Sequence, residues 1–266
     1  MTKITVLCND KAKDNFYFEY GFSALIEKDD TSFIFDTGST DVFLKNLKIL
    51  GKDINKIDNI VISHGHYDHF GGLRFLNEKE KRFNLWTKDE IFIPKYSKKV
   101  FAGIKKEELK DKYNFNIVKD DVLEIFPKVF ILGKVPMKSG FEEIDRNFEI
   151  KENESYKKDH FNEELNLVID DGKLILITGC AHRGIVNIVN FAIEKFNKRI
   201  DIVLGGFHLY NSSKKKLELI TKYLNEKKIN KLIPCHCTGD SAIKIFKEKF
   251  KGEVIECLAG ESFVFY

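Results

Sequence analysis

Short hydrophobic runs alternate with amphipathic stretches along the chain. Runs rich in Ile, Val, Leu and Phe have the length of strands, and in the first half they predict strands at residues 3–9, 20–27, 31–38 and 58–64. Residues 40–50 show the apolar spacing of a helix, with Thr40 or Asp41 placed as its N-cap. Strands that alternate with helices in this way predict an α/β fold.

The second half of the chain repeats this order. It predicts a hairpin that turns at Asp171 and Gly172, then a helix and another strand. These elements cover residues 165–179, 184–196 and 201–208. Each half runs strand, strand, Thr-Gly, helix, strand and histidine, which indicates a weak internal repeat with a period of roughly 140 residues. If the halves form two sheets, the histidines that end their strands, His64 and His208, would meet at one rim. A later strand brings His236 to a similar position.

The stretch from about residue 85 to residue 151 is less regular. It holds three of the four prolines, weak strand patterns and a Lys/Glu-rich helical pattern at residues 105–112. No low-complexity linker interrupts it, so we expect a single domain over residues 1–266, with this stretch inserted near the edge of the active site. Three of its residues are expected to line the entrance: Trp86, Lys95 and Tyr96.

The composition narrows the class of protein. Of the 266 residues, 43% are hydrophobic and 32% are charged, which is typical of a globular chain that buries a substantial core. The net charge of +3 comes from 44 basic and 41 acidic residues, and this balance argues against nucleic acid as a partner. No apolar run approaches a membrane span and no signal-peptide pattern begins the sequence, so we expect a cytoplasmic protein. Five cysteines, an odd number, then indicate reduced thiols.

Three of the seven histidines lie within six positions, in the stretch VISHGHYDHFGG at residues 61–72. A polar loop can carry histidines by chance, but their clustering favours a metal site, because imidazole is the commonest metal ligand. His64 and His66 point to the same side of an extended segment, whereas Asp68 and His69 begin a predicted helix and point elsewhere. The loop can therefore supply two metals, which at about 3.5–4 Å apart would hold a hydroxide between them.

The sequence HGHYDH at residues 64–69, followed by FGG, resembles the His-x-His-x-Asp-His motif of the metallo-β-lactamase-fold hydrolases. Other motifs resemble one branch of that superfamily, called dihydropteroate-synthase-like or 7,8-dihydropterin-6-yl-methyl-4-(β-D-ribofuranosyl)aminobenzene 5′-phosphate synthase-like. They are ITGCAHRGIVNIV at 177–189, GGFHL at 205–209 and PCHCTG at 234–239. The sequence FIFDTG at 33–38 is similar to the strand-loop motif near the start of the superfamily's fold. The resemblance implies a four-layer αββα sandwich of two mixed β-sheets flanked by helices, with the metals at one edge.

The resemblance also assigns roles to single residues. The metal ligands that it assigns most directly are His64, His66, Asp68, His69 and His236. Asp36 would brace the metal loop by hydrogen bonds rather than bind metal.

Four further residues have more than one candidate role. Cys180 stands where many relatives have a metal-bridging aspartate, and it either ligates a metal as a thiolate or is a small buried residue. His182 is the favoured third histidine ligand, and His160 competes for that role. His208 either binds metal, contacts a substrate phosphate or acts as a general acid, and the glycine pair before it would allow a close approach to a ligand.

Two rival interpretations are weaker. A Cys-His-Cys zinc knuckle lacks the spaced partners of a closed zinc site, and strand alternation places Cys235 and Cys237 opposite to His236. The sequence DTGS at residues 36–39 also occurs in aspartic proteases. Those enzymes need two aspartates that share a proton, and that interpretation would leave the histidines unexplained.

The resulting hypothesis is a dinuclear metal-dependent hydrolase. A metal-bound hydroxide attacks phosphorus or carbonyl, Asp68 orients it, and His208 contacts the oxyanion or protonates the leaving group. We expect two divalent ions, zinc or manganese, with iron also compatible. The substrate would be small and phosphorylated, nucleotide-like or pterin-like. The alternatives are a bond-forming enzyme of pterin biosynthesis and a redox or ligand-binding member of the fold without hydrolysis.

Overall fold

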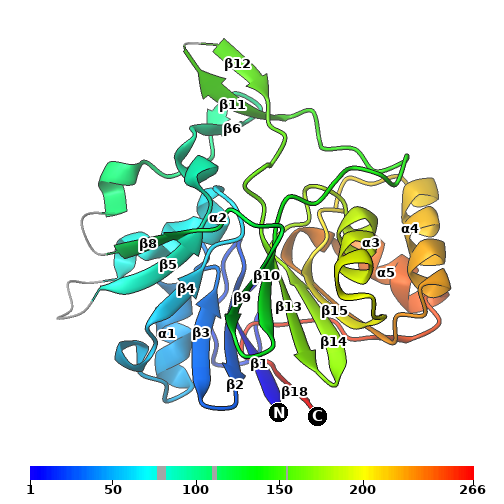
Figure 1. Ribbon diagram of the computed structural model, residues 1–266, viewed down its shortest axis with the longest axis horizontal. Coiled ribbons are helices and arrows are strands. Elements are labelled where there is room, and N and C mark those ends of the chain that lie inside the picture. Colours follow the sequence, from blue (N-terminus) through cyan, green and yellow to red (C-terminus); the bar gives the residue numbers. More distant parts are fainter. Residues whose placement is uncertain (77–81, 110–112, 154) are drawn as a thin grey trace. The chain divides into compact units, whose positions relative to one another are not determined.

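The computed structural model describes residues 1–76, 82–109, 113–153 and 155–266. The chain divides into two compact units. Unit 1 comprises residues 1–119, 144–163 and 258–266, and unit 2 comprises residues 120–143 and 164–257. Each unit is built around one seven-stranded mixed sheet (Figure 1).

The large sheet of unit 1 has the strand order β18-β1-β2-β3-β4-β5-β8. Its strands are β1 (Thr2–Cys8), β2 (Ser23–Lys28), β3 (Thr31–Phe35), β4 (Asn59–Val61), β5 (Phe83–Thr87), β8 (Tyr113–Ile117) and β18 (Ser262–Phe265). The strands from β18 to β3 pair antiparallel, and those from β3 to β8 pair parallel. Central strands such as β1 are buried on both faces, which explains their near-continuous apolar sequence.

Unit 1 also contains a helix and a smaller sheet. Helix α1 (Val42–Ile49) contacts β1 and buries Phe43 and Leu47 in the core of this unit. The smaller sheet is antiparallel, in the order β12-β11-β6-β7. Its strands are β6 (Lys95–Ser97), β7 (Val100–Phe101), β11 (Phe148–Glu152) and β12 (Ser155–Lys158).

Unit 2 has the strand order β17-β16-β15-β14-β13-β10-β9. The strands are β9 (Val122–Phe126), β10 (Val129–Leu132), β13 (Asn166–Asp171), β14 (Lys173–Thr178), β15 (Ile200–Gly206), β16 (Lys231–Cys235) and β17 (Glu253–Val254). Its helices are α3 (Ile185–Phe196), α4 (Lys214–Glu226) and α5 (Asp240–Lys249), and their apolar faces share one core with the sheet. The predicted hairpin is confirmed, because β13 and β14 pair antiparallel up to Asp171 and Lys173, around Gly172.

The two large sheets confirm the internal repeat. In each, an antiparallel hairpin leads through a helix into parallel strands: β2, β3, α1 and β4 in unit 1, and β13, β14, α3 and β15 in unit 2. His64 follows β4, and His208 follows β15, at corresponding places. Candidate ligands therefore lie at the carboxyl ends of parallel strands, where α/β sheets commonly bind ligands.

Residues 85–151 are divided among all three sheets. β5 and β8 belong to the large sheet of unit 1, β9 and β10 to the sheet of unit 2, and β6, β7 and β11 to the smaller sheet. Lys95 is 1% exposed, so its expected place at an entrance is wrong. Trp86 lies in β5, where its indole N–H donates to Asn59 Oδ1 at 3.1 Å.

Two predicted helices are shorter in the structure. The helix expected from Asp68 consists of α2 (Tyr67–Phe70) followed by a 3-10 turn at Gly71–Phe75. The helix expected at residues 105–112 is a 3-10 turn at Lys106–Leu109, and its last residues lie outside the described part of the chain. The glycine pair after α2 and the short charged run at residues 105–112 both disfavour longer helices.

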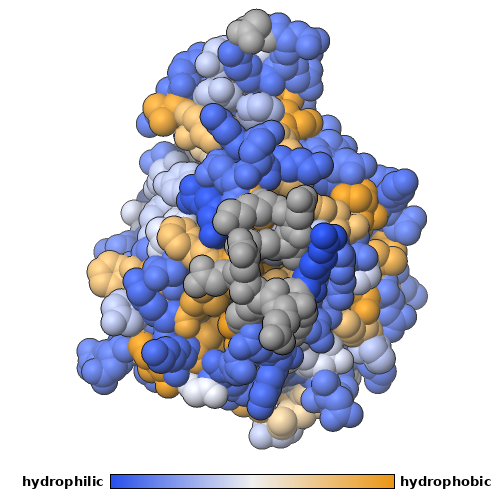
Figure 2. Space-filling model, turned by 90° about the vertical axis from the view of Figure 1, so that its left-hand side faces the viewer, coloured by the Kyte–Doolittle hydropathy of each residue, from blue (hydrophilic) through white to orange (hydrophobic). Residues whose placement is uncertain are grey.

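Among the residues that the structure describes, no helix is long and apolar enough to cross a membrane. The face in Figure 2 is mainly hydrophilic, and its hydrophobic side chains lie in separate patches. Scattered exposed apolar residues of this kind are ordinary on globular proteins.

Gly72 allows the segment after the histidine motif to pack against the loop after β3. A Cβ on Gly72 would overlap the carbonyl oxygen of Thr37 and lie 2.8 Å from Phe43 Cε1. We predict that Gly72→Ala lowers the free energy of unfolding by about 1–3 kcal/mol, because neither neighbour can move without disturbing the core. Urea denaturation measures the change.

Gly103→Ala is the matched control, since a Cβ there meets nothing closer than 3.4 Å. Its stability should stay within about 0.5 kcal/mol of the parent. Equal stability of the two variants would show that the close packing at Gly72 is not needed.

Candidate metal centre

Four candidate ligands of unit 1 follow strand β4. Strand β4 ends at Val61, the chain bends at Gly65, and His66 is the extended N-cap residue of α2. His64 and His66 therefore precede the helical turn, whereas Asp68 and His69 lie in it. All four side chains are buried. The division into two pairs of ligands, expected from the spacing, matches this backbone.

The buried side chain of Asp36 is hydrogen-bonded to the loop that carries the histidine motif. Its carboxylate accepts hydrogen bonds from Ser63 N, Ser63 Oγ and His69 Nδ1, each at 2.7 Å. The expectation that Asp36 braces the metal loop is therefore confirmed. Because the carboxylate keeps the His69 proton on Nδ1, Nε2 is the ring atom that can coordinate a metal.

Ser63 extends the brace to His64. Its hydroxyl donates to Asp36 and lies 2.9 Å from His64 Nδ1, so that nitrogen carries the proton and Nε2 is the ring atom that can coordinate a metal. His64 Nε2 in turn lies 3.1 Å from His66 Nδ1. Two nitrogen ligands on one tetrahedral zinc are roughly 3.3 Å apart, given bonds of about 2.0–2.1 Å. These two rings are thus arranged to share a metal, and sequence reasoning missed the serine that sets one of them.

His66 is held in the neutral form that binds metal. Burial lowers its pKa from 6.5 to about 3, helped by the positive charge of Lys95 and opposed by the carboxylates of Asp68 and Asp159. The ring of Phe148 lies 4.9 Å from that of His66 and excludes water on that side. Metal binding at His66 then needs no loss of a proton near neutral pH.

A buried ion cluster lies behind the same loop. Lys95 Nζ is 2.8 Å from Asp159 Oδ2 and 2.5 Å from Glu163 Oε1, and all three side chains are less than 5% exposed. Burial alone would lower the pKa of Lys95, but the two carboxylates raise it above its usual value. Burial also raises the pKa of Glu163, against the opposing charge of Lys95. A Cβ on Gly65 would lie 3.0 Å from Lys95 Cε, so the cluster packs directly against the metal loop.

Unit 2 gathers a second set of donors at its strand ends. Cys180 and His182 follow β14, His208 follows β15, and His236 follows β16. Ligand atoms of Cys180, His182 and His208 lie within 4.8 Å of one another, and so do those of Cys180, His236 and Cys237. The structure thus brings together the unit 2 residues that the sequence proposed. Imidazole and thiolate donors at this spacing fit a divalent metal such as zinc.

The backbone at these positions is unusual. Ala181, His208 and His236 have φ values of 56°, 49° and 43°, and Asp36 has 58°. Residues other than glycine rarely adopt this left-handed region, and such strain concentrates at functional sites. All four residues lie within three positions of the end of a strand.

The predicted alternation of Cys235, His236 and Cys237 is wrong. Strand β16 ends at Cys235, and His236–Thr238 form a 3-10 turn. Cys237 Sγ therefore lies 3.3 Å from Cys180 Sγ, whereas Cys235 Sγ contacts the carbonyl of Ile233. Burial alone would raise the pKa of Cys237, but its hydrogen bond with Cys180 and the imidazoles of His236 and His208 lower it well below its usual value.

A buried acid braces the unit 2 loop as well. Glu164, 1% exposed, accepts hydrogen bonds from the backbone N–H of His182 at 2.6 Å and of Arg183 at 3.1 Å. Sequence reasoning missed this residue, and the only signal for it is an acidic pair placed directly before an apolar strand. His160, the competing ligand, is exposed and belongs to none of the donor sets among the described residues.

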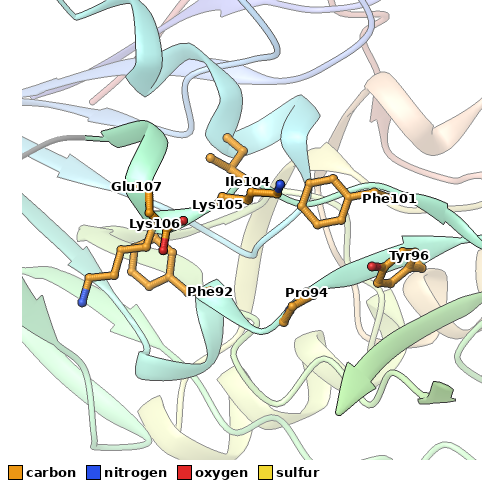
Figure 3. Close-up of a pocket in the computed structure, with 8 residues that line it drawn as sticks. All are labelled: Phe92, Pro94, Tyr96, Phe101, Ile104, Lys105, Lys106 and Glu107. Carbon is orange, nitrogen blue, oxygen red and sulfur yellow. The ribbon is translucent and has the colours of Figure 1, made fainter. Parts of the chain in front are cut away.

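A pocket of about 590 Å³ lies in unit 1, within the size range of small-molecule sites. Its lining is aromatic and basic: Phe92, Pro94, Tyr96, Phe101, Ile104, Lys105, Lys106 and Glu107 (Figure 3). Figure 3 shows the side chain of Lys106 extending beside the ring of Phe92, and Nζ lies 5.6 Å from its centroid. The wall of this pocket is tied to the metal loop, because Tyr67 N donates to the carbonyl of Ala102 at 2.8 Å. Tyr96 lines this pocket, and its expected place at the entrance of the active site stays a prediction.

A mixed α/β fold with histidine, carboxylate and thiol donors at its strand ends is typical of metal-dependent hydrolases. The family described as the metallo-beta-lactamase superfamily matches residues 17–144. An uncharacterized protein of Methanocaldococcus jannaschii is 33% identical over 90% of this chain and 92% of its own length. The 7,8-dihydropterin-6-methyl-4-(beta-D-ribofuranosyl)-aminobenzene-5′-phosphate synthase of the same organism is 30% identical over 97% of this chain and 95% of its own length.

A solved structure supports the same family. The crystal structure of Tm1679, a metal-dependent hydrolase of the beta-lactamase superfamily, matches with a TM-score of 0.92 and 38% identity over 100% of this chain and 99% of that one. The chain therefore belongs to the metallo-β-lactamase superfamily. The predicted fold class and the predicted resemblance are both confirmed. Members of this superfamily bind divalent metals, and their structures share this arrangement of mixed sheets and helices.

The Asp36 brace predicts a measurable effect on metal affinity. Asp36→Asn keeps the shape of the side chain but cannot accept all three hydrogen bonds, so we expect the metal affinity of the protein to fall about 10–100-fold. Competition with a fluorescent chelator measures the affinity. Asp41→Asn is the control, because Asp41 pairs with Lys45 on a partly exposed helix end. The brace is unimportant if both variants bind metal as tightly as the parent.

The ion cluster predicts a large effect on stability. Lys95→Met leaves the carboxylates of Asp159 and Glu163 buried together without their cation, so we expect a loss of about 3–5 kcal/mol in the free energy of unfolding. Lys99→Met breaks an exposed pair with Glu149 and should cost less than about 1 kcal/mol. Urea denaturation at neutral pH compares the two variants, and similar losses in both would contradict a special role for the buried cluster.

Proposed function

We propose that this chain is a metal-dependent hydrolase of small, phosphate-bearing substrates. The observation that carries the proposal is the carboxylate–histidine brace, in which Asp36 fixes His69 directly and His64 through Ser63. Bracing of this kind sets the tautomer and the direction of metal-binding histidines. A solvent-facing loop of chance histidines would not need a fully buried carboxylate beneath it.

The proposed ligands come from both units. They are His64, His66, Asp68 and His69 of unit 1, and Cys180, His182 and His236 of unit 2. The proposed cofactors are two divalent ions, zinc or manganese, with iron also compatible with these donors. Support comes from the match of the first four residues to the superfamily motif and from the donor distances within unit 2.

Bound divalent metal would lower the pKa of water and polarise a phosphoryl or carbonyl oxygen. Asp68, which is 6% exposed at the start of α2, is our candidate for orienting the attacking water and accepting its proton. His208 is our candidate for contacting the oxyanion or protonating the leaving group. It is half-buried, and its ring lies 4.4 Å from that of His182 and 5.3 Å from that of Tyr210.

The proposed substrate class follows from the pocket of unit 1. Three aromatic rings offer faces for a planar group, and Lys105 and Lys106 offer positive charge for a phosphate. The relative named as a synthase of a phosphate-bearing dihydropterin compound agrees with such a substrate. The five cysteines form no disulfide, which is compatible with a cytoplasmic protein.

A second function has one specific observation in its favour. The 30% identical relative is named as a synthase, so a bond-forming reaction in pterin biosynthesis is the alternative. Reaction in isotopically labelled water separates the two. Hydrolysis places labelled oxygen in the product, and bond formation without water does not.

Two variants distinguish ligands from other catalytic groups. We predict a metal stoichiometry of about two divalent ions per chain after purification without added metal. In a substrate screen, we expect the protein to hydrolyse phosphodiesters, phosphomonoesters, lactones or thioesters. Asp68→Asn should lower metal content and activity together. His208→Ala should lower kcat by about 10²-fold or more while most of the metal stays bound. Metal analysis and steady-state kinetics report both effects.

The control is His160→Ala, because this histidine is exposed and lies in none of the described donor sets. Its metal content and kcat should match those of the parent. Equal metal loss in His208→Ala and Asp68→Asn would make His208 a ligand. Full activity in protein that holds almost no metal would rule out the proposed function.

A further inference from the structure

Two buried thiols meet at the strand ends of unit 2. Cys180 and Cys237 are both 3% exposed, and their sulfurs are 3.3 Å apart. This distance is far longer than the roughly 2.05 Å of a disulfide. None of the five cysteines of the chain is in a disulfide. The pair is therefore a dithiol that the fold keeps together without a covalent bond.

Gly206 makes room for this pair. A Cβ at Gly206 would lie 2.4 Å from the carbonyl oxygen of Gly179, 2.7 Å from Cys237 Sγ and 3.4 Å from Cys180 Cα, so a larger residue would displace Cys237 and the backbone next to Cys180. The lack of a side chain at Gly206 thus leaves room for Cys237 Sγ at this strand end. The 3-10 turn at His236–Thr238 completes the arrangement, because it brings Cys237 round to the side of Cys180.

The neighbours of the dithiol are metal-binding groups. Ligand atoms of Cys180, Cys237 and His236 lie within 4.8 Å of one another. Cys180 is also within 4.8 Å of His182 and His208. Two thiolates on one tetrahedral zinc are about 3.8 Å apart, given bonds of about 2.3 Å, so a shift of about half an ångström would place both sulfurs on one ion.

We propose that Cys237 is a metal ligand together with Cys180, which makes unit 2 a thiolate-rich site. The inference rests on the proposed function only in that it assumes metal binding by unit 2. His236 supplies the nitrogen ligand. Such a donor set selects zinc or ferrous iron over manganese or magnesium, because thiolates are soft ligands and the latter ions prefer oxygen. This set differs from the Cys-His-Cys knuckle considered from the sequence, because Cys180 takes the place of Cys235.

Cobalt substitution tests this ligand set without any enzymatic assay. Full-length protein is stripped of metal and titrated with cobalt(II), and the sulfur-to-cobalt charge-transfer absorbance per bound cobalt is measured. Cys237→Ser and Cys180→Ser should each lower this absorbance to about half of the parent value. Cys235→Ser is the matched control, since this buried thiol is two residues away and contacts a carbonyl, and its absorbance should equal that of the parent.

Cadmium NMR of the unaltered protein covers the case in which a variant fails to fold, because the cadmium resonance moves downfield with each sulfur ligand. One resonance of a two-sulfur site supports the proposal. Cobalt binding with the parent absorbance in Cys237→Ser, or cadmium binding without any resonance of a two-sulfur site, overturns it and leaves the proposed hydrolase intact. Two-sulfur metal binding without any hydrolysis supports this inference while the proposed function fails, and absence of metal binding overturns both.

Discussion

The buried carboxylate of Asp36 is the group on which the metal loop depends. It accepts three hydrogen bonds, two from Ser63 and one from His69, and it is fully buried. Its backbone φ of 58° is a conformation that costs energy for any residue with a Cβ, and the surrounding contacts must offset that cost. Removing the carboxylate would leave donors unsatisfied in the protein interior, which is more costly than the loss of one hydrogen bond. The direction of two histidine rings follows from this one side chain.

Buried carboxylates also hold the donor-bearing loops of unit 2. A buried acid, Glu164, holds the backbone N–H groups of the loop that carries Cys180 and His182. A second, Glu142, accepts from the first N–H groups of α3 at Val186 and Asn187. Burial raises the pKa of Glu142, and these backbone hydrogen bonds oppose the rise. In both units, strand ends present donors and buried carboxylates fix the loops, which is how a rigid scaffold positions a site.

Much of the fold could be predicted because its strands are buried on both faces. β1, β14 and β15 read as apolar runs, and the repeat of strands, helix and histidine was visible from them. The smaller sheet could not be predicted, because strands such as β12 are exposed along their length and carry no hydrophobic pattern. The shortness of α2 also escaped prediction, since paired glycines pack against another loop there.

The candidate ligands could be predicted where they form a local motif, as at His64 to His69. The residues that hold these ligands in place could not be predicted from the sequence. Ser63 and Glu164 act through hydrogen bonds to partners that are set by the fold, and neither type of residue is distinctive in sequence. Cys237 was misplaced because a strand was assumed to continue where the chain turns at His236.

Anomalous diffraction from crystals of the protein purified without added metal tests the account most directly. The account predicts metal density bonded to His64 Nε2 and His66 Nδ1 at about 2.0–2.1 Å, with His69 bound through Nε2. Active protein whose anomalous map shows no metal at these nitrogens, or His69 bound through the nitrogen that donates to Asp36, would contradict it.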